Sequence, residues 1–220
     1  MDSGCAIMAS QTALSAACAT DNPVVAVSCQ RFGIEPRITP LLSGIDALGY
    51  SRFEDQLSTP KGSKSLSVKL QFDYPSQWSR LPPQNTITLV DGNSGLKVYC
   101  LQVRLPEATA LAETPKAFLA DAIFAPAGSL SKSGASIEEY KVSSAKMVEA
   151  PDGGESRKLA LKYTVVTPAN QRIVERRALA NVYQVDEMAY ILLASATSSK
   201  WESGEKERCQ RVVDSFVISR

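Results

Sequence analysis

The feature that most constrains the fold is a series of four β-rich segments separated by short breaks. The segments are residues 140–150, 159–168, 177–185 and 188–195. The breaks contain clusters of turn-forming residues, namely Pro151-Asp152-Gly153-Gly154, Pro168-Ala169-Asn170-Gln171 and Asp186-Glu187. Strands joined by such short connections run antiparallel, because a parallel pair needs a crossover of a dozen or more residues. The sequence therefore predicts an antiparallel meander.

Another strand is predicted earlier in the chain. Between Leu66 and Tyr74 apolar residues alternate with polar ones, which is the period of a half-buried strand. Pro75 is expected to end this strand. The large ring of Trp78, three residues later, is expected to cover the end of the sheet, where we assign it a structural role.

Residues 86–90 and 96–105 predict a hairpin, since both are rich in apolar and β-branched residues and a turn-forming cluster separates them. That cluster, Asp91-x-Asn93-x-Gly95, is similar to the opening of a calcium-binding loop. A complete loop needs further oxygen ligands and a closing acid, and residues 96–100 provide none. A hairpin turn is therefore the favoured interpretation.

Two helices are predicted from start signals and helical spacing. The first begins at Thr114-Pro115, with Thr114 as cap, and ends at Pro126; its buried face is Phe118, Leu119, Ala122 and Ile123. The second closes the chain, with Ser203 as a cap and a buried face formed by Cys209, Val212, Val213 and Phe216. We expect structural roles for Phe216 and for Trp201, which precedes this helix and is interpreted as a packing anchor.

This order of elements predicts an α+β fold, with a central antiparallel β-sheet sandwiched by helices. Residues 1–50 show no sustained strand or helix period, so we expect an extended, irregular N-terminal anchoring segment followed by a domain over residues 51–220. The first 60 residues carry three basic and six acidic side chains, and the rest of the chain carries 21 and 17. The extension is thus mildly acidic and the domain mildly basic.

Composition excludes several classes of function. The formal charge is only +1, which is unlike the basic excess of nucleic-acid-binding proteins. The chain has no histidine, so histidine-assisted nucleophiles and most zinc sites are excluded. Neighbouring acids such as Glu138-Glu139 and Asp186-Glu187 are interpreted as solvated charges. We therefore expect no catalytic residues, no metal site and no directly bound cofactor.

The five cysteines are far apart and contain no Cys-x-x-Cys motif. Cys100 and Cys209 fall in a predicted strand and helix and are interpreted as small buried apolar residues, with a bond between them as the less favoured alternative. A disulfide among Cys5, Cys18 and Cys29, for example from Cys18 to Cys29, stays open.

Four stretches resemble the PsbP family of extrinsic lumenal photosystem proteins, which includes PsbP-like and PsbP-domain relatives. In chain order they are residues 68–78, which end in Pro-x-x-Trp; residues 98–103; residues 114–119; and residues 190–196 followed by Lys200-Trp201 and Ser215-Phe216. The resemblance covers residues 64–220. Residues 1–63 match no extension of the family, and metal sites built on family histidines cannot be transferred.

The resemblance implies a non-enzymatic subunit in the thylakoid lumen of the chloroplast, part of a hetero-complex with a photosystem core and other extrinsic subunits. Photosystem II is favoured, where the protein would help the oxygen-evolving complex to retain calcium and chloride by shielding. The alternatives are a photosystem I subunit or assembly factor and, less favoured, an enzyme or small-ligand carrier. The longest apolar stretch, residues 188–196, is shorter than the roughly 18 to 20 residues that span a bilayer, so we expect peripheral attachment.

A basic surface is the candidate contact with the partner. Its predicted members lie on two neighbouring strands: Lys158, Lys162, Arg172, Arg176 and Arg177. The resemblance implies that such surfaces meet acidic lumenal ones, and a solvated sheet edge is the alternative interpretation.

Overall fold

The computed structural model describes residues 49–58, 67–82, 86–132, 136–150, 153–167 and 172–219. Most of the predicted extension, with Cys5, Cys18 and Cys29, lies outside these residues, and a disulfide there stays a prediction.

The larger sheet contains the predicted meander and hairpin. Its seven strands are ordered β3-β4-β5-β9-β8-β7-β6, and every neighbouring pair is antiparallel. The meander is confirmed as β6 (Ser136–Glu149), β7 (Glu155–Thr167), β8 (Arg172–Val185) and β9 (Met188–Thr197). The hairpin is confirmed as β4 (Ile87–Val90) and β5 (Lys97–Arg104), and β3 (Ser79–Leu81) adds a short edge.

The loop between β4 and β5 is held as a turn by Asp91. One carboxylate oxygen accepts a bond from the Asn93 amide at 2.9 Å, and the other accepts one from the Ser94 hydroxyl at 2.7 Å. The Gly95 amide donates to the Asp91 carbonyl at 2.9 Å. Both carboxylate oxygens of Asp91 are thus used within the turn, as expected for a hairpin connection.

A smaller sheet was only partly predicted. It has the order β1-β2-β10, formed by β1 (Tyr50–Ser58), β2 (Ser67–Pro75) and β10 (Val217–Ser219). The predicted strand is β2, whose alternate residues Val68, Leu70 and Phe72 are buried. Strand β1 pairs with it along nine positions.

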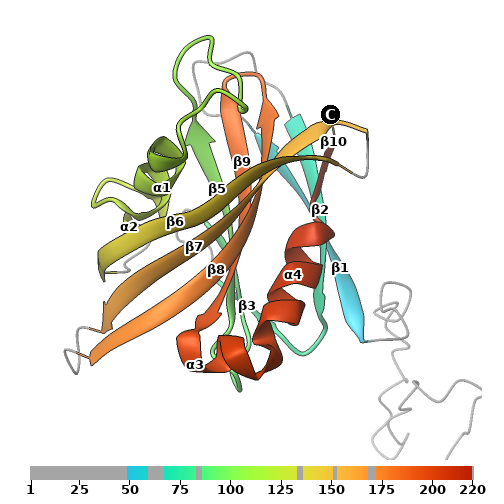
Figure 1. Cartoon of the computed structure of the whole chain (residues 1–220). Helices are drawn as coiled ribbons and strands as arrows, with labels where there is room; N and C mark the ends of the chain where they lie inside the picture. Colours follow the sequence, from blue (N-terminus) through green and yellow to red (C-terminus); the bar gives the residue numbers. More distant parts are fainter. Residues whose placement is uncertain are drawn as a thin grey trace, which may run out of the picture. The chain divides into compact units, whose positions relative to one another are not determined.

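The large sheet is covered on both faces (Figure 1). On one face α1 (Lys116–Phe124) and α2 (Ser129–Lys132) pack over a core that includes Leu101, Leu161 and Leu193. The other face is covered by the small sheet and by α3 (Ser198–Lys200), a π-type turn η2 (Trp201–Glu205) and α4 (Lys206–Asp214). The predicted α+β sandwich is confirmed.

The predicted helix caps are wrong. The Thr114 hydroxyl donates to the Ala110 carbonyl, and the Ser203 hydroxyl donates to the Lys200 carbonyl. Neither α1 nor α4 has a side-chain cap. The buried face of α1 is also shifted, since its buried residues are Leu119, Ala120, Ile123 and Phe124. Phe118 and Ala122 are only half-buried.

The aromatic residues assigned to packing belong to the core beneath α4. The relative solvent exposure is 5% for Trp78, 8% for Trp201 and 0% for Phe216. Cys100 and Cys209 lie in the same core as free thiols. Burial raises the pKa of each thiol to about 12, so both stay protonated at neutral pH.

Removing residues 1–47 should leave the domain folded, because the described core residues begin in β1. The ring of Phe53 in β1 is buried and stacks on Phe72 with centroids 4.9 Å apart. Thermal melting of the truncated chain should match that of the full chain. As a control, a chain that starts after Ser58 lacks β1 and should lose its cooperative transition. Unfolding of the shorter truncation would show that the extension belongs to the core.

Candidate protein-docking surface

The predicted basic residues do not all share one face of the sheet. Successive residues of a strand point to opposite faces. Lys162 lies opposite Arg177 in the β7–β8 register, and Lys158 lies opposite Asn181, whose side-chain amide donates to the Val213 carbonyl of α4. Lys158, Lys162 and Arg177 therefore lie on the face that carries α4.

Arg176 has to be removed from the predicted surface. It lies on the face of α1, with Ala178 and Val182, and is only 7% exposed. Its guanidinium Nη2 donates to the Gly95 carbonyl at 2.9 Å and to the Ser195 carbonyl at 3.0 Å. Arg176 thus joins the β4–β5 turn to β9 and has a structural role. The side chain of Arg172 lies outside the described residues.

Lys97 lies near Arg176 and carries the same positive charge. Desolvation by burial, followed by repulsion from Arg176, lowers the pKa of Lys97. The hydroxyl of Tyr163 donates to the Ser195 hydroxyl at 2.9 Å in the same region. Burial raises the pKa of this tyrosine, which therefore remains neutral.

Two cations of the α4 face are paired with acids from the segment that covers it. The ammonium of Lys158 lies 2.5 Å from a carboxylate oxygen of Asp214, the last residue of α4. The guanidinium of Arg177 forms an ion pair with Glu202, which lies in η2. All four side chains remain at least 30% exposed, so these pairs can exchange with solvent or with another charged group.

Two lysines of the same face were missed from the sequence. In the β6–β7 register, Lys141 lies directly opposite Lys162, and Lys146 lies directly opposite Lys158. Finding them required the register between β6 and β7. This register is hard to predict from sequence, because β6 has two irregularities, one between Ile137 and Tyr140 and one between Val142 and Ser144. We call this set the basic array: Lys141, Lys146, Lys158, Lys162 and Arg177.

The basic array is accessible, because Lys141, Lys146 and Lys162 are exposed and the side chains of Lys158 and Arg177 are at least 30% exposed. An open groove of about 710 Å³ lies at one end of the array and includes Lys141 and Lys162. Its other lining residues are Glu138, Glu139, Tyr140, Tyr163, Thr164, Ile173 and Glu175. Ile173 is 65% exposed, so the groove combines charged groups with an apolar side chain.

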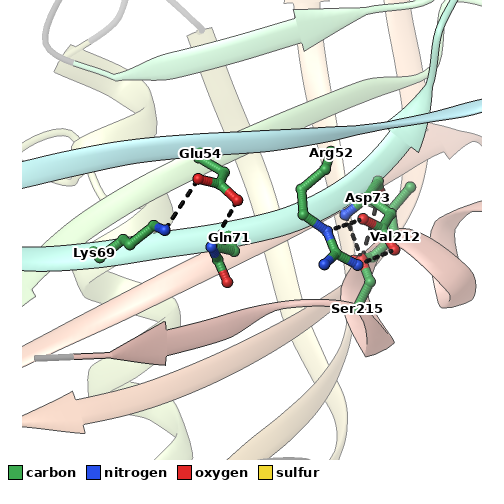
Figure 2. A network of polar contacts seen from close by, with 7 residues as sticks. All are labelled: Arg52, Glu54, Lys69, Gln71, Asp73, Val212 and Ser215. Atoms are coloured by element: carbon green, nitrogen blue, oxygen red, sulfur yellow. Dashed lines mark hydrogen bonds and ion pairs between the residues drawn. The ribbon is translucent and has the colours of Figure 1, made fainter. Parts of the chain in front are cut away.

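On the outer face of the small sheet, by contrast, each basic side chain drawn in Figure 2 is paired with an acid. There Arg52 lies opposite Asp73 and forms an ion pair at 2.9 Å. Glu54 binds the ammonium of Lys69 at 3.0 Å and accepts a bond from Gln71 at 2.8 Å. Charges on this face are neutralised locally, which makes the basic array the better candidate for docking.

Among the described residues, no group of three or more acids or cysteines gathers in the manner of a metal site. No helix within the described ranges is long and apolar enough to cross a membrane.

Comparisons with known proteins identify a fold. No family model and no curated protein matches the chain. The solution structure of cyanobacterial PsbP (CyanoP) from Synechocystis sp. PCC 6803 is similar, with a TM-score of 0.51 and 16% identity; the match covers 80% of this chain and 96% of that one. The domain therefore has a PsbP-like fold.

Weaker similarities include the following two proteins. The Ran-binding protein Mog1p of Saccharomyces cerevisiae has a TM-score of 0.41 and 9% identity, over 76% of this chain and 96% of that one. LpqN of Mycobacterium tuberculosis, involved in cell envelope biogenesis, has a TM-score of 0.43 and 12% identity, over 77% and 92%.

Proposed function

We propose that this protein is a non-catalytic extrinsic subunit that docks on the lumenal side of a photosystem, with photosystem II as the favoured partner. The observation that carries the proposal is the PsbP-like fold, which matches nearly the whole of CyanoP. Four sequence stretches similar to the PsbP family, in family order, support the same assignment.

The basic array supports docking by charge. Five cations lie on three adjacent strands, and a surface of this kind attracts and orients an acidic partner. The N-terminal extension would add contacts as an anchor. In this arrangement the protein helps to retain calcium and chloride by covering the site, while other subunits bind the ions.

The partner can be identified by fractionation. Thylakoids are solubilised under mild conditions, the photosystems are separated, and this chain is detected in each fraction. Co-migration with photosystem II is the expected result, and release at high salt would indicate attachment by charge. Co-migration with photosystem I would replace the favoured partner by the alternative, while absence from both photosystems in every fraction would overturn the docking function.

A further inference from the structure

The basic array places like charges directly against one another. Lys141, Lys162 and Arg177 form one row across β6, β7 and β8, and Lys146 and Lys158 form a second row. Directly opposed side chains on one face of a sheet have Cβ atoms only about 4.5–5.5 Å apart, and like charges in this position are destabilising. An acidic group bound between them would relieve this repulsion.

The segment that covers the sheet already provides two such acids. Asp214 neutralises Lys158, and its bond with Gln210 at 2.7 Å helps to hold it there. Glu202 neutralises Arg177 from the η2 turn. This turn leaves helical geometry at Ser203 and Gly204, and the φ of 110° at Gly204 is readily adopted only by glycine.

The other three cations of the array differ in this respect. Within the described part of the chain, no ion pair includes Lys141, Lys146 or Lys162. The array thus contains cations that are masked by the α3–α4 segment and cations that are free to bind a partner.

We propose that Asp214 and Glu202 are built-in competitors for an acidic segment of the partner protein. The segment binds first to Lys141 and Lys162 at the groove and then replaces Asp214 on Lys158 and Glu202 on Arg177. This inference rests on the proposed docking function and identifies the chemistry of the partner: an extended acidic polypeptide.

The spacing of the rows defines that polypeptide further. Lys158 and Lys162 are four residues apart on β7, which corresponds to about 13 Å along the strand. An extended segment matches this distance with acids at positions i and i+4. Glu138, Glu139 and Glu175 also line the groove and would repel an uninterrupted polyanion, so spaced acids fit better than a continuous run.

Single substitutions in the full-length chain test the competition. K162E should weaken binding to isolated photosystem membranes by about tenfold or more, whereas D214N and E202Q should each strengthen it about two- to fivefold. Two controls make the same charge changes elsewhere: K116E on α1, and E113Q in the exposed loop before α1. Melting curves establish that every variant is folded.

A peptide separates this inference from the proposed function. The probe is an extended serine-rich peptide with aspartates at i and i+4, and its scrambled form places the same aspartates together. Tighter binding of the spaced peptide, increased by D214N beyond the effect of E113Q, supports the competition even if no photosystem binds. A photosystem bound equally well by the wild type, K162E and D214N would overturn the competition and leave the docking function standing.

Discussion

Replacing Phe216 with alanine is expected to lower the free energy of unfolding by about 3–5 kcal/mol, among the largest effects of any single truncation in this domain. The side chain is completely buried between the small sheet and the large one. Its ring lies 6.5 Å from that of Phe72 and 5.4 Å from that of Tyr183, both in edge-to-face geometry. Removing it leaves a cavity that the neighbouring rigid strands cannot fill.

Chemical denaturation measures this loss. Phe216→Leu provides a folded comparison, because it keeps most of the apolar volume and should cost much less. Phe118→Ala provides a control on the half-buried face of α1, where a smaller loss is expected. A loss below about 1 kcal/mol for Phe216→Ala would show that the ring does not hold the two sheets together.

Arg176→Met is expected to destabilise the domain by about 2–4 kcal/mol. Methionine fills a similar length but leaves the Gly95 and Ser195 carbonyls without the guanidinium donor. The bond to Ser195 is buried and the bond to Gly95 is partly buried, so losing the donor carries a desolvation penalty that is largest at Ser195. The β4–β5 turn should also loosen, since Gly95 is one of the two residues held.

Arg177→Met is the matched comparison, one residue along the same strand. Its ion pair with Glu202 is exposed, and such pairs contribute about 0–1 kcal/mol. Arg176→Lys tests the geometry of the contact, because lysine keeps the charge without the planar set of donors. Equal effects of Arg176→Met and Arg177→Met in denaturation would refute the structural role of Arg176. Reversing both arginines together would mix a folding defect with a binding defect.

Much of the large sheet was predictable because its signals are local. The turn-forming clusters that separate the four β-rich segments lie close to the observed connections, and the hairpin turn at Asp91 is recognisable from five residues. Strand β1 was missed because Tyr50, Phe53 and Leu57 do not alternate with period 2. Strand β10 was missed because its three residues carry too little pattern and owe their structure to pairing with β2.

The candidate surface was less predictable, for two different reasons. Arg176 and Arg177 are adjacent on one strand, so their side chains point to opposite faces of the sheet. Ala178 and Ala180 share the face of Arg176, and these small apolar residues indicate that this face is buried. That signal was present in the sequence. The pairing of Lys141 with Lys162 depends on irregularities in β6, which only the three-dimensional register reveals.

The closing strand β10 determines when the domain can finish folding. It pairs with residues 69–71 of β2, and the nearby bond from the Asp73 amide to the Ser215 hydroxyl joins residues 142 positions apart. Such distant contacts raise contact order and slow folding, because a long loop must close before they form. The core beneath α4 stays incomplete until β10 has paired with β2. A folding intermediate in which β10 is not yet paired therefore exposes apolar surface of this core and is prone to aggregation.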